Sequence, residues 1–197
     1  MENKEEYEIE VHPLEPWLPE NAKVLFMGTF PPGKHRWSMH FYYPNVINDF
    51  WRIMGLLFTG DKNALYNEKE KTFFLDKIKT LTKEKGIAMS DTVKRARRLK
   101  GNASDKYLEV LEGNDPTRLL SMMPLCTDIA TTGEKAANVI AGLTGTAAPK
   151  MGEYSIWDYN GRIIRIWRMP STSRAYPMAI EKKAEYYRRL LKTCGIL

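Results

Sequence analysis

The chain has 197 residues, of which 43% are hydrophobic and 27% are charged, a composition that excludes a disordered or membrane-embedded protein. It is long enough to bury a core without disulfides or metal, and its apolar runs fall far short of the roughly 20 residues that a membrane span requires. The formal net charge of +6, from 30 Lys and Arg against 24 Asp and Glu, favours a polyanionic partner such as nucleic acid.

Two cysteines, Cys126 and Cys194, lie far apart and have no neighbouring pattern of metal ligands. Two thiols cannot complete a four-cysteine zinc or iron–sulfur site, so we predict no metal ion, no iron–sulfur cluster and no other cofactor. The acidic residues 1–10 contain no apolar stretch and do not resemble a signal peptide. We therefore expect a cytoplasmic location, where a disulfide is disfavoured.

The first part of the chain predicts a leader, a strand and a long loop. Residues 1–20 read as an extended leader that packs Trp17 and Leu18 against the rest of the protein. The apolar run over 23–29 predicts a buried strand that ends at a glycine. The following loop, residues 30–47, is rich in Pro, His, Arg and aromatic residues, and a loop of this length in a globular domain usually has a function.

Two helices are predicted next. Asn48 is a favoured capping residue and begins a helix that runs to Phe58, with Asp49 in the first turn, where an acidic side chain suits the helix dipole. A second helix is predicted over 68–85 and stops at Gly86.

The middle of the chain is mixed. A short strand is predicted over 87–90, and short helices over 91–120, separated by Gly101 and by residues 113–116. Within this stretch, residues 94–100 carry five positive charges in seven positions. Such a run fits either a solvated helix face or a contact with phosphates.

The last part predicts alternating strands and helices. A strand over 125–131 feeds a helix over 133–142, and Asn160-Gly161 is a strong two-residue hairpin signal within 154–168. An amphipathic helix over 177–193 closes the chain.

This alternation predicts an α/β fold: a single three-layer domain over 1–197, with a mostly parallel central sheet flanked by helices. Ligands of such folds bind beyond the carboxyl ends of strands. The loops over 30–47 and 170–176 both leave such ends, so we predict that they form one site.

Three segments occur in an informative order. They are Gly28-Thr-Phe-Pro-Pro-Gly33 with Tyr42-Tyr43 and Asn48-Asp-Phe-Trp51, then Thr132-Gly-Glu-Lys-Ala136, then Met169-Pro-Ser-Thr-Ser173. Together they resemble the motifs of the uracil-DNA glycosylase superfamily over nearly the whole chain. They are most similar to the hypoxanthine-type and mismatch-specific branches, in which an Asn precedes a helix that begins with Phe-Trp.

The chain also departs from the pattern of that family. Phe30 stands where many members carry an Asp or Asn that positions the attacking water, and Met169 stands where many carry His or Asn. The hypoxanthine-type branch is similarly apolar at the first position and relies on the later Asn, which matches Asn48. Residues Val46-Ile47 replace a common Pro-Arg, which leaves the substrate base open.

The resemblance implies a monofunctional DNA glycosylase that hydrolyses the N-glycosidic bond of a flipped-out deaminated base, such as uracil or hypoxanthine. Asn48 would orient water or bind the leaving base, although a plain helix cap is the competing interpretation. Tyr43 would stack on the base, with core packing as its alternative. The residues expected to form the base pocket are Gly28, Thr29, Phe30, Pro31 and Tyr43.

The implied partner is DNA that contains a damaged or mismatched base, and the expected state is a monomer. The residues expected to contact DNA are Lys34, Arg36, Pro170, Ser171, Thr172 and Ser173. His35 and His40 are interpreted as solvated loop residues rather than general acids. No single lysine is singled out as a nucleophile, so simple hydrolysis is predicted.

Two other functions stay open. One is a DNA-binding protein of the same fold without catalysis, which the apolar Phe30 and Met169 suggest. The other is a nucleosidase that acts on small substrates, which the basic net charge and the Pro-Ser loop disfavour.

Overall fold

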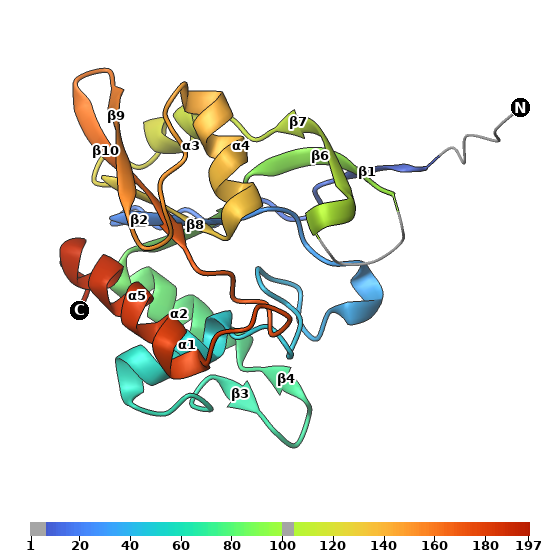
Figure 1. Cartoon of the computed structure of the whole chain (residues 1–197). Helices are drawn as coiled ribbons and strands as arrows, with labels where there is room; N and C mark the ends of the chain where they lie inside the picture. Colours follow the sequence, from blue (N-terminus) through green and yellow to red (C-terminus); the bar gives the residue numbers. More distant parts are fainter. Residues whose placement is uncertain (1–6, 100–104) are drawn as a thin grey trace, which may run out of the picture.

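A five-stranded sheet lies at the centre of the structure, a computed structural model that describes residues 7–99 and 105–197 (Figure 1). Its strands are β2 (Val24–Gly28), β5 (Ile87–Asp91), β8 (Asp128–Thr132), β9 (Tyr154–Tyr159) and β10 (Arg162–Met169). They lie in the order β5-β2-β8-β10-β9; the first four are parallel, and β9 pairs antiparallel with β10. The predicted α/β fold with a mostly parallel central sheet is therefore confirmed.

Helices cover both faces of this sheet. Among the described residues they are α1 (Phe50–Thr59), α2 (Leu75–Lys85), α3 (Pro116–Ser121), α4 (Glu134–Thr144) and α5 (Ile180–Thr193). Figure 1 shows α1, α2 and α5 on one face and α3 and α4 on the other. The alternation of side chains along β2 serves both layers, because Val24 and Phe26 pack into one core cluster and Leu25 and Met27 into the other.

A second sheet occupies part of the stretch for which short helices were predicted. It has the order β1-β6-β7 and is formed by β1 (Ile9–Val11), β6 (Val93–Arg98) and β7 (Leu108–Gly113), all antiparallel. The helical prediction over 91–120 is wrong for β6 and β7 and holds only for α3 and the single turn η2 (Asp105–Tyr107). Val93, Ala96 and Leu108 form a small core between these strands, and this burial overrides the local charge pattern. Gly101 lies outside the described residues.

The helix predicted over 68–85 begins later than expected. A short hairpin of β3 (Tyr66–Asn67) and β4 (Thr72–Phe73) precedes α2. Lys71 has a φ of 49°, which no helix accommodates, and the buried Phe73 anchors the hairpin to the core. The helix ends before Gly86, as predicted. Gly86 has a φ of 67°, a left-handed conformation that glycine adopts at helix ends.

The C-terminal part follows the sequence prediction closely. Asn160 and Gly161 have φ values of 52° and 81° and join β9 to β10 in a tight hairpin. The last helix starts at Ile180 rather than at Pro177, and its predicted apolar side chains are buried: Ala184, Tyr187, Leu190 and Leu191. Within residues 7–99 and 105–197, none of the helices combines the length and apolarity needed to cross a membrane.

Candidate active site

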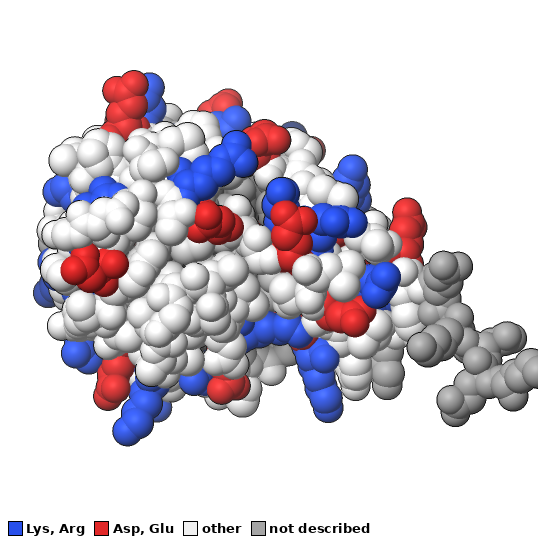
Figure 2. Space-filling model, turned by 90° about the horizontal axis from the view of Figure 1, so that it is seen from above, with Lys and Arg blue, Asp and Glu red and all other residues white. Residues whose placement is uncertain are grey.

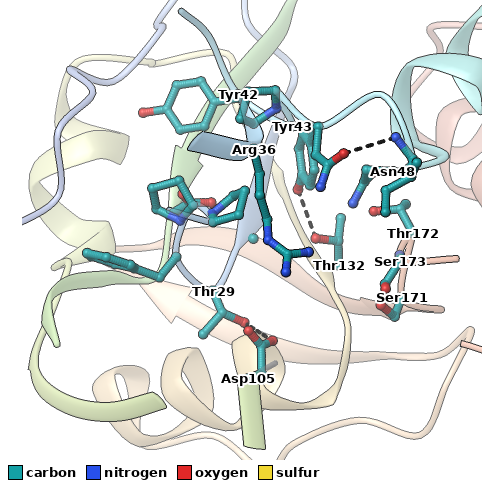
Figure 3. Close-up of a pocket in the computed structure, with 18 of the residues that line it drawn as sticks. Thr29, Arg36, Tyr42, Tyr43, Asn48, Asp105, Thr132, Ser171, Thr172 and Ser173 are labelled. Carbon is teal, nitrogen blue, oxygen red and sulfur yellow. Dashed lines mark hydrogen bonds between the residues drawn. The ribbon is translucent and has the colours of Figure 1, made fainter. Parts of the chain in front are cut away.

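A cavity of about 610 Å³ opens beyond the carboxyl ends of β2, β5 and β8 (Figure 3). Its walls come from these strand ends, from the long loop after β2, from the start of α1 and from the loop after β10. The structure brings ten of the predicted site residues together here: Gly28, Thr29, Phe30, Pro31, Arg36, Tyr43, Asn48, Ser171, Thr172 and Ser173. Parallel strands deliver their ends to one edge of a sheet, which is why residues so far apart in sequence meet.

The two remaining predicted residues lie beside this cavity. Pro170 lines an adjoining cavity, which shares Asp105, Lys106, Ser171 and Tyr176 with the first. Lys34 is exposed in a single turn, η1 (Lys34–Arg36), and does not line the first cavity.

Gly28 is required by a close approach of polar groups. A Cβ at this position would lie 2.6 Å from Asp91 Oδ1 and 3.4 Å from the hydroxyl oxygen of Tyr43. A larger residue would push both groups out of the cavity floor, so glycine lets a carboxylate and a phenol line it.

Tyr43 forms an aromatic wall that is held in place on several sides. Its ring stacks on Phe50 with a centroid distance of 4.0 Å and an interplanar angle of 9°. Its hydroxyl group shares a 2.8 Å hydrogen bond with Thr132 Oγ1, and its φ of 51° fixes the chain in an unusual conformation. Burial raises the pKa of Tyr43 well above its ordinary value, so the phenol stays neutral. Tyr43 is thus packed against the core on one face and borders the cavity as well.

Asn48 was predicted to cap the first helix, but the N-cap of α1 is Asp49, and Asn48 lies one residue before it and lines the cavity. Its Oδ1 accepts a 2.9 Å hydrogen bond from the backbone N–H of Phe50, which fixes the orientation of the carboxamide. An isolated antiparallel bridge joins Asn48 to Ser173 of the loop after β10. The amide nitrogen of Asn48 donates to no described residue, so the side chain offers two N–H donors to a ligand.

Asp91 is a carboxylate of the cavity that sequence reasoning missed. It ends β5, is only 6% exposed, and receives a 2.8 Å hydrogen bond on Oδ2 from His12 Nε2. Its Oδ1, the atom that a Cβ on Gly28 would meet first, has no hydrogen-bond partner among the described residues. A polar residue directly after a buried strand was the available signal, because that strand ends at the same edge as β2.

Both ring nitrogens of His12 have hydrogen-bond partners, and the backbone N–H of Leu14 also lies 3.3 Å from Nδ1. Nε2 faces Asp91, and Nδ1 lies 3.0 Å from the carbonyl oxygen of Leu14. Burial lowers the pKa of His12, but the hydrogen bond and charge of Asp91, aided by Leu14 and Glu15, outweigh it and raise the pKa above its ordinary value. Nε2 therefore donates to Asp91, whereas Nδ1 can donate to the Leu14 carbonyl oxygen or accept from the Leu14 N–H.

A second missed carboxylate, Asp105, lies on the opposite wall from Tyr43 (Figure 3). Thr29 donates its hydroxyl hydrogen to Asp105 Oδ2 over 2.7 Å, and Lys135 Nζ donates to the Asp105 carbonyl oxygen over 2.7 Å. Burial raises the pKa of Asp105, although Thr29 and Lys135 act in the other direction. The sequence carried no local signal for this residue, because the strands around it were read as helices.

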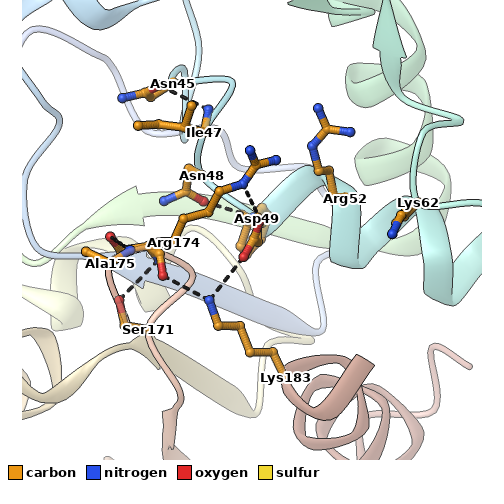
Figure 4. A network of polar contacts seen from close by, with 12 residues as sticks. Asn45, Ile47, Asn48, Asp49, Arg52, Lys62, Ser171, Arg174, Ala175 and Lys183 are labelled. Atoms are coloured by element: carbon orange, nitrogen blue, oxygen red, sulfur yellow. Dashed lines mark hydrogen bonds and ion pairs between the residues drawn. The ribbon is translucent and has the colours of Figure 1, made fainter. Parts of the chain in front are cut away.

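A buried ion-pair network fixes the loop over 170–176 against the start of α1 (Figure 4). Asp49 accepts from Arg174 Nε at 3.0 Å and from Lys183 Nζ at 3.1 Å. Lys183 is fully buried and also donates to the carbonyl oxygen of Ser173 at 2.9 Å. The backbone N–H of Asp49 donates to the Thr172 carbonyl oxygen at 2.8 Å. Asn48 and the Pro-Ser loop are therefore held as one unit.

The serine hydroxyl groups of this loop accept hydrogen bonds from the backbone and can still donate their own hydrogens. Ser171 Oγ accepts from the Ser173 N–H, and Ser173 Oγ accepts from the Ala175 N–H, each over 3.2 Å. Both hydroxyl hydrogens stay free to donate to an anionic ligand such as a phosphate.

The basic run over 94–100 does not form a helix face. Its described cations lie on β6 and pair with glutamates: Lys94 with Glu112, Arg95 with Glu112, Arg97 with Glu109 and Arg98 with Glu10. Lys100 lies outside the described residues. Figure 2 likewise shows acidic and basic side chains interspersed on one face of the molecule rather than gathered by sign. These ion pairs weaken the interpretation of the run as a phosphate contact.

Within the described parts of the chain, no group of three or more His, Cys, Asp or Glu side chains could hold a metal ion. Cys126 and Cys194 are both free thiols, and burial raises the pKa of Cys126 to about 12.

The fold and the cavity define a class: a three-layer α/β protein whose ligand site lies at the carboxyl ends of parallel strands. No family model matches the chain. It is 30% identical over 119 residues to a hypoxanthine DNA glycosylase of Methanosarcina acetivorans, which covers 60% of this chain and 68% of the relative. The chain belongs to the uracil-DNA glycosylase superfamily.

A solved structure supports this assignment across the fold. A solution NMR structure of a Methanosarcina acetivorans protein, provisionally named a uracil DNA glycosylase, superposes with a TM-score of 0.63. The match has 25% sequence identity and covers 94% of this chain and 99% of the other. The similarity therefore extends over both helical layers and the sheet between them.

Proposed function

We propose that the protein is a monofunctional DNA glycosylase, which hydrolyses the N-glycosidic bond of a deaminated base flipped out of DNA. The observation that carries this proposal is the free carboxamide N–H pair of Asn48 beside the stacked ring of Tyr43, within one cavity. The cavity is within the range of volumes that binds a small organic ligand, about 300 to 1,000 Å³. The family membership supports DNA as the source of that ligand.

Each wall then has a chemical role. Tyr43 presents an immobile aromatic surface to the base, because Phe50 and Thr132 hold its ring and hydroxyl group. Cleavage passes through an oxocarbenium-like state in which negative charge develops on the departing base. The amide N–H groups of Asn48 would stabilise that charge, and Asp91 Oδ1 would accept a hydrogen bond from a base N–H.

Phe30 contributes an apolar wall to the cavity. Its ring lies edge-on to His12 at 5.4 Å and beneath the guanidinium of Arg98 at 5.5 Å. It is a wall that packs against Val93 and Leu108 rather than a group that could orient water. The polar groups of the cavity therefore come from Asn48 and from the strand ends.

DNA would approach from the loop side of the cavity. Arg36 is exposed there, and its guanidinium group has no hydrogen-bond or ion-pair partner among the described residues, so it can bind a phosphate. The hydroxyl groups of Ser171 and Ser173 would bind the backbone on the other rim. We also propose that residues 1–197 work as a single domain and a monomer, because one chain lines the whole cavity.

The test is base release from labelled oligonucleotides that each carry one uracil, hypoxanthine, xanthine or mismatched thymine, in single and double strands. We expect release of at least one deaminated base, and loss of that release in Asn48→Ala. Tight salt-dependent binding of DNA without release of any base would instead support the non-catalytic alternative. Release from free nucleosides alone would support a nucleosidase.

A further inference from the structure

Asp105 is a carboxyl group that lines the cavity without a role in the reaction described above. It stands at the boundary with the adjoining cavity, which it also lines. Its backbone belongs to the single turn η2, and its carbonyl oxygen accepts from Lys135 Nζ of α4 at 2.7 Å. Its side chain is held separately, because the Thr29 hydroxyl group donates to Oδ2 at 2.7 Å. Contacts from two different elements therefore fix the position of this carboxyl group.

The second carboxyl oxygen of Asp105, Oδ1, is open to a ligand. Thr29 occupies Oδ2, whereas Oδ1 accepts a hydrogen bond from no residue in the parts of the chain that the structure describes. The carboxyl group lies across the cavity from the ring of Tyr43 (Figure 3). A carboxylate oxygen carries two acceptor sites, so Oδ1 can bind a water molecule inside the cavity.

Charged groups of both signs surround Asp105. Burial opposes its ionisation, as does the charge of Asp91, while the Thr29 hydrogen bond and the charges of Lys135 and Arg98 favour it. Burial is the largest of these effects, so the pKa of Asp105 lies above its ordinary value, which makes the carboxylate a better proton acceptor. The titratable groups of the surrounding elements are Arg36 of η1, the phenols of Tyr42 and Tyr43, Asp91 of β5 with its partner His12, Arg98 of β6 with its partner Glu10, Lys106 and Tyr107 beside η2, Lys135 of α4, and Glu134 of α4 with its partner Arg168.

The proposed reaction needs a proton acceptor that the groups around the base do not supply. In that reaction Asn48 offers N–H donors to the departing base, and Asp91 Oδ1 accepts from the base itself. A water molecule that attacks the sugar carbon has to lose a proton, for which a carboxylate is a suitable base. Asp105 lies away from the wall that Tyr43 and Asn48 form, and the adjoining cavity gives water access to it.

We propose that Asp105 is a further catalytic residue, whose Oδ1 binds the attacking water and removes its proton. This inference rests on the proposed glycosylase function. The bond between the sugar C1′ and the base nitrogen breaks, and its electron pair leaves with the base. The water oxygen forms a bond to C1′ while one water proton passes to Asp105 Oδ1. The departing base then takes up a proton from the solvent, and Asp105 returns its proton to the solvent.

The first experiment measures single-turnover base release by Asp105→Asn, on the deaminated-base oligonucleotide from which the wild type releases base fastest. The amide oxygen can still accept from Thr29, but the side chain no longer removes a proton. We expect release to fall about 100-fold or more while the affinity for the same oligonucleotide is kept. Glu109→Gln is the matched control and should release base at the wild-type rate, because Glu109 is also an acid but pairs with Arg97 and lines neither cavity. Thermal unfolding checks that each variant is folded.

The second experiment follows base release from about pH 4.5 to about pH 8. Only the ionised carboxylate can remove a proton, so wild-type release should fall as the pH drops through the pKa of Asp105. Asp105→Asn should lose that fall. Thr29→Val removes the hydrogen bond that lowers the pKa of Asp105, so in this variant the fall should move to higher pH.

A folded Asp105→Asn variant that releases base at a rate near that of the wild type would overturn this inference alone. A reduced rate that keeps the wild-type fall at acid pH would also overturn it, because it would indicate a structural role. No release of any base by the wild type would overturn the proposed function and the inference with it.

Discussion

At the scale of single residues, Asn48 shows how one side chain combines a local and a distant role. Its oxygen accepts from the Phe50 N–H at the start of α1, and its nitrogen faces the cavity. This hydrogen bond is what points the two N–H donors outward, since a carboxamide has its oxygen and nitrogen on opposite sides. The contact at the helix start and the proposed catalysis are thus one arrangement rather than competing interpretations.

Asn48→Ala should separate stability from turnover. The loss of the Asn48 hydrogen bond to the first N–H of α1 costs about 1 kcal/mol of unfolding free energy, which leaves the protein folded. Asp115→Ala is a matched control, because Asp115 caps α3 through the Thr117 N–H at 2.8 Å and does not line the cavity. Urea unfolding should give similar losses for both variants, while base release should fall only in Asn48→Ala. Equal losses of release would remove Asn48 from the catalytic assignment.

Asn48→Asp tests whether base release depends on the amide N–H groups of the side chain or on its oxygen. The carboxylate keeps an acceptor for the Phe50 N–H and suits the start of a helix, but it has no donor. If the N–H groups stabilise the departing base, single-turnover release should fall roughly 100-fold or more while stability is retained. A rate near that of the wild type would show that the side chain works through its accepting oxygen, by orienting water.

At the scale of elements, the loop over 170–176 is held by a contact between α1 and α5. Asp49 lies at the start of α1, and Lys183 lies in the first turns of α5. Lys183 pairs with Asp49 and also donates to the Ser173 carbonyl oxygen. A loop with hydroxyl groups aimed at a ligand has to be placed accurately, and its own serine turns are too small to do this alone. The elements on one face of the sheet therefore determine the shape of the rim.

Lys183→Met should be strongly destabilising. Lys183 is fully buried, and its loss leaves the nearly buried Asp49 paired only with Arg174, at a cost of about 3 kcal/mol. Lys182→Met, one residue earlier and exposed, should stay within about 0.5 kcal/mol of the wild type. Urea unfolding measures both. Adding Asp49→Asn to Lys183→Met should recover part of the loss, and a purely additive double variant would contradict the coupling.

At the scale of the whole molecule, a net charge of +6 does not by itself locate a DNA surface. Four described cations of β6 are paired with glutamates, whereas Arg36 has no such partner and borders the cavity. The charges that could release counterions from DNA are therefore those at the rim rather than those in the densest basic run.

Arg36→Gln should weaken DNA binding and reduce the slope of log affinity against log salt by about one. Arg97→Gln changes the net charge equally, but Arg97 already pairs with Glu109 at 3.3 Å, so its effect on that slope should be small. Fluorescence anisotropy over a range of salt concentrations measures both. A larger effect of Arg97→Gln than of Arg36→Gln would indicate that DNA binds at β6.

Local patterns in the sequence determined much of the scaffold. The apolar run of β2, the Asn160-Gly161 turn and the stop at Gly86 were predicted because each depends on neighbours within a few residues. The start of α1 was predicted to within one residue, since its N-cap is Asp49 rather than Asn48. The same is true of the two loops that border the cavity, since a loop after a parallel strand must leave at the carboxyl edge.

Only the tertiary structure decided the rest. The charged run over 94–98 became a strand because Val93 and Ala96 pack against Leu108 across the sheet, a contact that no local period reveals. His12 and Asp91 are 79 positions apart, and Asp49 and Lys183 are 134 apart. Such pairs carry no signal in one sequence, because hydrogen bonds between distant segments depend on how the elements pack rather than on which residues adjoin them.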